Sequence, residues 1–145
     1  MAHSLGRIWI HAVWSTKNRA PLIEPEKEHI IYDLMETEFL NQGCPVRIIN
    51  GVPDHVHSLF LLNLKIAVSD IIRHVKGCSS HEINDQNIIR YKFTWQTGFA
   101  AFSVSESSLE KVFQYIKNQK RHHRKMSFEE EYEKLIRLHG LQNND

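Results

Sequence analysis

The feature that most constrains the fold is a pair of short β-prone runs in the middle of the chain. Residues 45–49 and 56–62 are rich in branched and aromatic side chains, and the link between them carries the turn signals Asn50-Gly51 and Pro53-Asp54. Two strands joined by so short a link pair antiparallel. Any fold for this chain must therefore contain an antiparallel sheet.

The flanking segments alternate between strand and helix patterns. Residues 7–16 favour a first strand, and residues 25–42 favour a helix that starts at Pro25 and stops before Gly43. A second helix is expected from Val68 to about Ile83, and residues 93–104 favour a strand that is interrupted at Gly98. The apolar spacing of Leu109, Val112, Phe113 and Ile116 predicts a third helix, and residues 128–138 predict a short amphipathic helix.

The order strand, helix, strand, strand, helix, strand predicts an α+β fold of the ferredoxin-like, split βαββαβ type. Such a fold has an antiparallel sheet with two helices on one face, and here further C-terminal helices follow. The length of 145 residues predicts a single domain over residues 1–145, with a core of about 7–126 and a helical tail of about 127–145.

Composition excludes several classes of protein. Hydrophobic residues make up 41% and charged residues 24% of the chain, which is typical of globular rather than disordered or membrane-spanning proteins. The first residues lack the apolar core of a signal peptide, so we expect a cytoplasmic protein of bacterial type with no membrane partner. Two cysteines, Cys44 and Cys78, are too few for a disulfide scaffold and are expected to be structural thiols.

The third predicted strand carries the sequence Asp54-His55-Val56-His57. Alternation along a strand places His55 and His57 on one face and Val56 on the other, so the two imidazoles could form half of a metal site. In a chain with ten histidines, such a pair alone is more often an ordinary surface or core feature.

Tyr115 and Gln119 lie four residues apart on the third predicted helix, beside its apolar stripe rather than on it. A phenol nucleophile and an amide ligand at this spacing could serve a metal-assisted phosphoryl transfer, although a half-exposed packing tyrosine has the same pattern. The following run, residues 117–125, has seven Lys, Arg and His residues among nine, and net charge over the chain is only +1. This density suits a phosphate-backbone patch, and it is also typical of a solvated helix end.

Four stretches together carry a family resemblance. Residues 11–22, the motif Pro53-Asp54-His55-Val56-His57, residues 95–105 and the run Tyr115-Ile116-Lys117-Asn118-Gln119 resemble the short insertion-sequence, single-tyrosine transposases of the HUH endonuclease superfamily. HUH stands for two histidines that flank a bulky hydrophobic residue. The resemblance, which covers about residues 8–140, extends to the insertion-sequence 200/605 group and the REP-associated tyrosine transposases.

The resemblance implies a specific chemistry. His55, His57 and Gln119 would hold a divalent ion, and Tyr115 would attack a DNA phosphate to leave a 5′-phosphotyrosine and a free 3′-OH. The ligand set suits Mn²⁺, while cellular abundance favours Mg²⁺. Relatives act as homodimers on hairpins in single-stranded DNA, with the tyrosine in some cases acting in trans.

Basic and aromatic side chains supply candidate DNA contacts. Six residues are expected to contact phosphates: Lys17, Arg19, Lys76, Lys120, Arg121 and Arg124. Trp14, Trp95 and Phe99 could stack on bases, although buried aromatic residues would show the same pattern. The glutamate-rich tail after Lys125 has no place in the family scheme.

Two other functions remain open from the sequence. One is a non-catalytic nucleic-acid-binding module on a ferredoxin-like sheet, which would bind without metal. The other is a zinc hydrolase, which needs a third ligand beside His55 and His57, and His11 is the only candidate that the spacing suggests.

Overall fold

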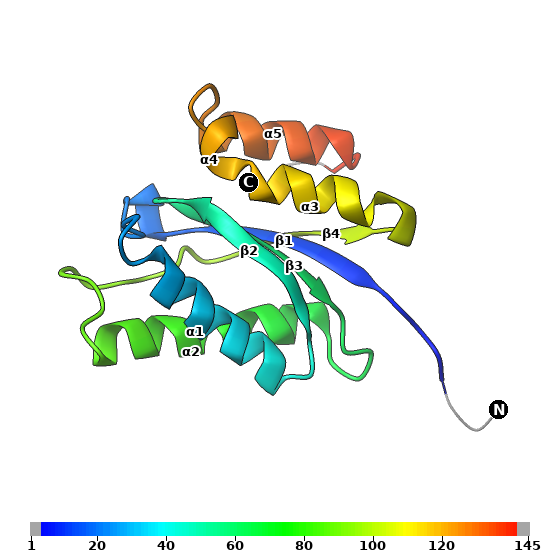
Figure 1. Cartoon of the computed structure of the whole chain (residues 1–145), viewed down its shortest axis with the longest axis horizontal. Helices are drawn as coiled ribbons and strands as arrows, with labels where there is room; N and C mark the ends of the chain where they lie inside the picture. The colour runs from blue at the N-terminus through cyan, green and yellow to red at the C-terminus, as the bar shows by residue number, and fades with distance from the viewer. Residues whose placement is uncertain (1–3, 142–145) are drawn as a thin grey trace.

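The computed structural model describes residues 4–141, which form a four-stranded antiparallel sheet between two layers of helices (Figure 1). The strands are β1 (Trp9–Ser15), β2 (Val46–Val52), β3 (His55–Leu61) and β4 (Ala100–Val104), in the order β2-β3-β1-β4 across the sheet. Helix α1 (Glu28–Asn41) connects β1 to β2, and α2 (Val68–Asp85) connects β3 to β4. The predicted α+β class and βαββαβ order are therefore confirmed.

Strand β3 lies inside the sheet, with a hydrogen-bonded neighbour on each side. It pairs with β1, where His55 faces Ser15 and His57 faces Val13, and with β2, where the same histidines face Val52 and Asn50. A strand held on both edges has little freedom to shift its register. The direction of the two histidine side chains is therefore fixed by the sheet itself.

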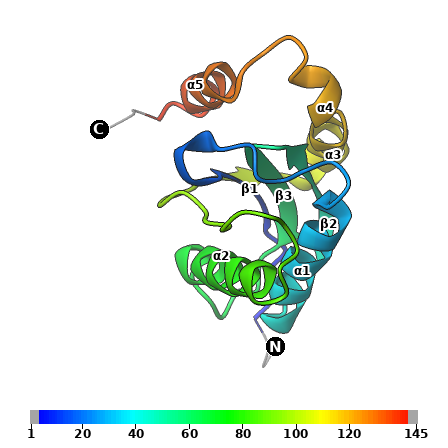
Figure 2. The same ribbon diagram turned by 90° about the vertical axis from the view of Figure 1, so that its left-hand side faces the viewer.

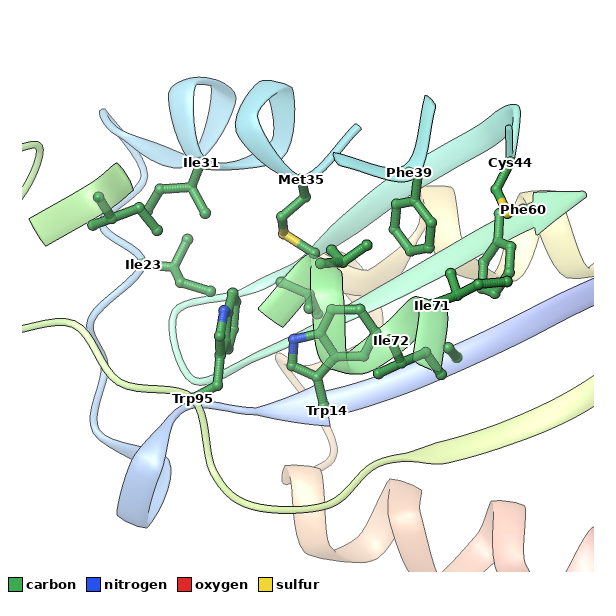
Figure 3. Close-up of a cluster of buried hydrophobic side chains, with 14 of the residues drawn as sticks. Trp14, Ile23, Ile31, Met35, Phe39, Cys44, Phe60, Ile71, Ile72 and Trp95 are labelled. Atoms are coloured by element: carbon green, nitrogen blue, oxygen red, sulfur yellow. The ribbon is translucent and has the colours of Figure 1, made fainter. Parts of the chain in front are cut away.

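The main hydrophobic core lies between one face of the sheet and helices α1 and α2 (Figure 3). Alternate residues of the strands enter it, and α1 contributes one side chain per turn. Its fully or nearly fully buried members include Ala12, Trp14, Ile31, Met35, Phe39, Val56, Phe60, Ile71, Ile72 and Val75. Each large side chain buried here contributes about 1.5–3 kcal/mol of transfer free energy, so this layer holds the sheet in place.

The opposite face of the sheet is covered by α3 (Leu109–Lys117), α4 (Gln119–His122) and α5 (Phe128–Leu138) (Figures 1 and 2). Two short 3-10 helices lie earlier in the chain, η1 (Lys17–Arg19) after β1 and η2 (Glu106–Ser108) before α3. Two smaller apolar clusters attach the covering helices to the sheet. One contains Trp9, Leu59 and Ile116, and the other contains Val13, Ala100, Phe102 and Leu135. None of the helices within residues 4–141 is long and apolar enough to cross a membrane. The division into a core of 7–126 and a tail of 127–145 stays a prediction, and residues 142–145 lie outside the described part.

Two predicted elements have different bounds in the structure. Helix α1 begins at Glu28 rather than at residue 25, because residues 24–27 form a turn in which the Lys27 amide donates to the Glu24 carbonyl at 2.9 Å. The predicted strand 93–104 is confirmed in part: β4 begins only at Ala100, and the first half pairs just beyond the end of β1 at one antiparallel bridge, between Trp95 and Thr16. The Asn84 side chain also binds both the N–H and the carbonyl of Phe93, which ties the start of this segment to α2.

The helix predicted to carry both Tyr115 and Gln119 is interrupted at Asn118. Helix α3 ends at Lys117 and α4 begins at Gln119. The Asn50 amide of β2 donates to the carbonyls of Ile116 and Lys117, at 2.9 and 3.1 Å. These carbonyls would otherwise accept the next bonds of a continuous helix. Because β2 takes them, the helix breaks directly before Gln119.

Gly51 of β2 packs closely against the backbone of His55 and Val56 on β3. A Cβ atom at Gly51 would lie 2.2 Å from the His55 carbonyl oxygen and 2.9 Å from the Val56 Cα, both backbone atoms. We expect Gly51→Ala to lower the free energy of unfolding by about 1–3 kcal/mol, as overpacked sites do. Urea denaturation measures the change.

Gly77 provides the matched control for this substitution. It lies within α2, and a Cβ atom there would meet no atom within 4 Å. Gly77→Ala should raise stability by about 0.5–1 kcal/mol, because alanine has the better helix propensity. Equal stability of the Gly51→Ala variant and the parent would show that the hairpin tolerates the displacement.

Candidate catalytic centre

His55 and His57 lie on the sheet face that α3, α4 and α5 cover, and both are fully buried. Their ring centroids are 5.3 Å apart. Val56, between them, enters the core under α1 and α2. The strand alternation expected from the sequence is thus confirmed, and the two imidazoles face the same interior site.

Outer partners turn the Nε2 atom of each imidazole toward this site. The Nδ1 of His57 lies 2.8 Å from His11 Nε2, and the Nδ1 of His55 lies 2.8 Å from the Asp54 carboxylate. His123, which directly follows α4, is oriented in the same way, with its Nδ1 2.7 Å from the Met126 carbonyl. Such outer partners are typical of metal-binding histidines, because they fix the ring and its tautomer.

Tyr115 and Gln119 converge on the same site despite the break at Asn118. The Tyr115 ring lies 5.9 Å from the His57 ring, centroid to centroid, in an edge arrangement. Gln119 is fully buried, and its side-chain oxygen has no hydrogen-bond partner. A buried carbonyl oxygen without a partner is costly unless something else satisfies it. The structure therefore brings the predicted nucleophile and all three predicted ligands together.

A carboxylate that the sequence analysis did not single out joins these groups. Oε1 of Glu131 on α5 lies 3.1, 2.9 and 2.9 Å from the Nε2 atoms of His55, His57 and His123. Its Oε2 accepts hydrogen bonds from the Tyr115 hydroxyl and, at 2.9 Å, from the Gln119 amide. Glu131 is only 1% exposed. One buried anion thus links every element of the site.

The sequence did contain a signal for Glu131. Helix α5 is amphipathic, and Leu135 and Ile136 form its buried side together with Glu131. Glu131 is four residues before Leu135, so it lies on the apolar face, where a charge needs a partner. His123 carried no comparable signal, because it was one of several cations in a basic run.

The protonation behaviour of the site follows from burial and from the buried carboxylate. Burial alone would raise the pKa of Glu131, but hydrogen bonds from His123, His55 and His57 hold that pKa well below its usual range. Burial and the hydrogen bond to Glu131 raise the pKa of the Tyr115 phenol. Burial also lowers the pKa of His11 to about 3, so this ring stays neutral behind His57. The phenol therefore keeps its proton and donates a hydrogen bond to the ionised Glu131 carboxylate.

The donor set of the site fits a divalent ion. Ligand atoms of His55, His57, His123 and Glu131 all lie within 4.8 Å of one another, and the Gln119 oxygen lacks a partner beside them. In an octahedral shell with metal–ligand distances of about 2.0–2.1 Å, neighbouring ligands are separated by roughly 2.9 Å. The distances of 2.9–3.1 Å from Glu131 to the three imidazoles are close to that separation.

The six basic residues predicted to contact DNA do not form one patch. Arg19, Lys120 and Arg124 line one pocket together with His123, at the edge of the site. Within it, Lys120 binds the Asn50 side chain at 2.7 Å, and Arg19 pairs with Glu129. The other three lie apart: Arg121 lines a separate pocket beside His122, Lys17 is exposed on η1, and Lys76 donates to the carbonyls of Gln96 and Gly98.

The three aromatic residues considered for base stacking also separate. Trp14 and Trp95 are 2% and 7% exposed and pack in the main core, whereas Phe99 is 40% exposed. Only Phe99 remains available to a base from the described surface.

Comparisons with known proteins identify relatives of this chain. The chain is 23% identical over 118 residues to the ISDra2 transposase TnpA of Deinococcus radiodurans, which covers 75% of this chain and 81% of that protein. Among solved structures, a protein assigned as a transposase from Deinococcus radiodurans R1 has a TM-score of 0.65 at 21% identity, covering 82% of this chain and 95% of that one. A REP-associated tyrosine transposase bound to a REP hairpin has a TM-score of 0.62 at 15% identity, covering 85% and 74%.

These structural likenesses confirm the fold, and the sequence model of one family decides the membership. The family described as "Transposase IS200 like" matches residues 4–119, which include His55, His57, Tyr115 and Gln119. The resemblance seen in the sequence motifs is therefore confirmed. The chain belongs to the IS200-like transposase family.

Proposed function

We propose that this transposase cleaves and rejoins single-stranded DNA through a 5′-phosphotyrosine at Tyr115, with a divalent metal held by His55, His57 and Gln119. One observation carries the proposal. The Tyr115 hydroxyl, the Gln119 amide and the His55 and His57 Nε2 atoms all converge on a single buried anion, the Glu131 carboxylate. A site that already binds one anion with these groups is suited to the oxygens of a phosphodiester.

The reaction follows from the groups present. The Tyr115 oxygen forms a bond to phosphorus, the bond from phosphorus to the 3′ oxygen breaks, and the phenol proton leaves as the 3′ oxygen gains one. The DNA then carries its 5′ phosphate on Tyr115, and a later 3′-OH can attack this ester to restore a phosphodiester. Bound Mg²⁺ or Mn²⁺ would supply Lewis-acid polarisation of the phosphate.

The Glu131 carboxylate must leave the site before Tyr115 can attack a phosphodiester. A phosphodiester placed between Tyr115 and the histidines needs the same donors that the Glu131 carboxylate occupies. Two anions in one buried site also repel each other strongly. We infer that DNA entry displaces the Glu131 side chain, and with it part of the packing of α5.

Hairpin or single-stranded DNA is the substrate that the family relationship favours, and a related structure contains a REP hairpin. The pocket lined by Arg19, Lys120 and Arg124 opens beside His123, so we propose it as the path of the DNA backbone. Lys17, Lys76 and Arg121 stay proposed contacts at a greater distance from this path. An enzyme of this kind would act in the bacterial cytoplasm.

The nucleophile and the metal residues come from one chain, so we propose that Tyr115 acts in cis. The Tyr115 ring lies 5.9 Å, centroid to centroid, from the His57 ring of the same chain. The homodimer predicted from the resemblance is compatible with this arrangement, and the delivery of a partner's tyrosine is not needed for it.

A zinc hydrolase is the second candidate, because the structure supplies ligands that the sequence did not suggest. His123 and Glu131 lie beside His55 and His57, whereas His11 points to the back of His57 and serves as its outer partner. A hydrolase would not need Tyr115. Substitution of Tyr115 therefore separates the two functions.

Tyr115→Phe should abolish the covalent adduct between the protein and hairpin-bearing DNA, because phenylalanine has no oxygen to attack phosphorus. DNA binding and folding should stay unchanged. Denaturing gel electrophoresis after incubation with Mg²⁺ or Mn²⁺ detects the adduct. Tyr91, which is 62% exposed, gives the control, since Tyr91→Phe should retain full adduct formation. DNA cleavage that persists in the Tyr115→Phe variant would favour the hydrolase instead.

Glu131→Ala should lower the free energy of unfolding of the metal-free protein by about 3 kcal/mol, because it leaves several buried donors without their acceptor. Glu133, on the exposed side of α5, is the matched control, and Glu133→Ala should change stability by less than about 0.5 kcal/mol. Chemical denaturation in the presence of a chelator measures both. Similar values for the two variants would contradict the role of Glu131 as the link between α5 and the sheet.

A further inference from the structure

A second group of metal-ligand side chains comes from α1 and α2. These helices lie on the opposite face of the sheet from α3, the helix that carries Tyr115 (Figures 1 and 2). Glu38 comes from α1, and His74 and Cys78 come from α2. One ligand atom from each lies within 4.8 Å of the others. No residue of this group takes part in the catalytic centre.

We propose that Glu38, His74 and Cys78 form a zinc-binding site that joins α1 to α2. The three residues offer a carboxylate oxygen, an imidazole nitrogen and a thiolate sulfur, a combination that suits Zn²⁺ and disfavours Mg²⁺ and Ca²⁺. Three protein ligands leave the fourth tetrahedral position to water.

Two of the ligand pairs are separated by distances close to those of a tetrahedral shell. The His74 Nε2 lies 3.0 Å from Glu38 Oε2 and 3.6 Å from Cys78 Sγ. With zinc at about 2.0–2.2 Å from nitrogen and oxygen and about 2.3 Å from sulfur, ligand pairs are separated by roughly 3.3–3.6 Å. The Cys78 sulfur also lies 3.8 Å from His74 Nδ1, so the imidazole would turn to direct its Nε2 toward an ion shared with the sulfur.

The helices hold the ligands in this position. His74 and Cys78 are four residues apart, so they lie on one stripe of α2. Glu38 reaches them from α1, and Gln42, one turn later, donates to the Ile71 carbonyl of α2 at 3.2 Å. The spacing between the two helices is thus set by contacts other than the proposed ligands.

Exposure and charge favour a cation here. The His74 side chain is 44% exposed and that of Glu38 is 17% exposed, so an ion can enter from solvent. Cys78 is a free thiol, and partial burial with the neighbouring charges of Glu38 and Glu82 raises its pKa. Zinc binding would reverse that effect, since the thiol releases its proton to water as the zinc–sulfur bond forms. Cys44, by contrast, is buried in the core.

Cobalt substitution tests the site directly. The full-length reduced protein is titrated with Co²⁺, and the thiolate-to-cobalt charge-transfer absorption reports a cysteine ligand. The catalytic centre has no cysteine, so it cannot produce this band. We expect the band in the parent and in Cys44→Ala, and its complete loss in Cys78→Ser.

Two further variants test the other ligands. His74→Ala and Glu38→Gln should weaken Zn²⁺ binding, measured by competition with Co²⁺, by more than the roughly 10- to 100-fold that loss of an outer partner costs. Absence of the band in the parent, or a band lost in Cys44→Ala but kept in Cys78→Ser, would overturn the proposal. An unchanged metal affinity in both His74→Ala and Glu38→Gln would also overturn the proposal, since it would indicate that the Cys78 thiol binds the metal alone.

A measurement on the unaltered chain covers the case in which a variant does not fold. In the native protein, Zn²⁺ should slow the reaction of Cys78 with iodoacetamide. Mass spectrometry measures the extent of this alkylation over time. Equal alkylation with and without Zn²⁺ would also overturn the site.

Discussion

The carboxylate of Glu131 is the group on which the second half of this structure depends. Helices α3, α4 and α5 contact the sheet through two small apolar clusters and through the polar contacts of Asn50 with Ile116, Lys117 and Lys120. The contacts of one buried anion with histidines of β3, with Tyr115 and with Gln119 join these parts into one unit. Because the low dielectric of the interior strengthens each contact, loss of the anion would weaken the attachment of all three helices to the sheet together.

The sheet supplies two of the histidines of the centre, and the helices supply Tyr115 and Gln119. His55 and His57 lie on an interior strand, and His11 and Asp54 fix their rings from behind. Tyr115 and Gln119 lie on either side of a helix break that Asn50 imposes. The centre is thus assembled from two parts of the fold, a strand of the sheet and the helices that cover it.

Local pattern predicted most of the fold and half of the site. Alternation placed His55 and His57 on one face, and helical spacing placed Tyr115 near Gln119. The break at Asn118 depends on Asn50, more than sixty residues earlier, so no local pattern contains it. Glu131 had a local signal, its place on the apolar face of α5, but its partners, like those of His123, are defined only once α5 folds back over the sheet. The segment 93–99 keeps one bridge beside the end of β1, at Trp95, and contacts from Asn84 and Ser79 of α2 to Phe93 and Trp95 hold the rest of its first half.

Complementation between two inactive variants determines whether a single chain assembles the nucleophile and the metal residues. The Tyr115→Phe and His57→Ala chains are co-expressed, purified as a mixture and incubated with hairpin DNA and Mn²⁺. If Tyr115 acts in cis, no chain in the mixture has a complete centre, and the mixture should form no more covalent adduct than either variant alone. Adduct restored in the mixture, on the His57→Ala chain that retains Tyr115, would contradict the account.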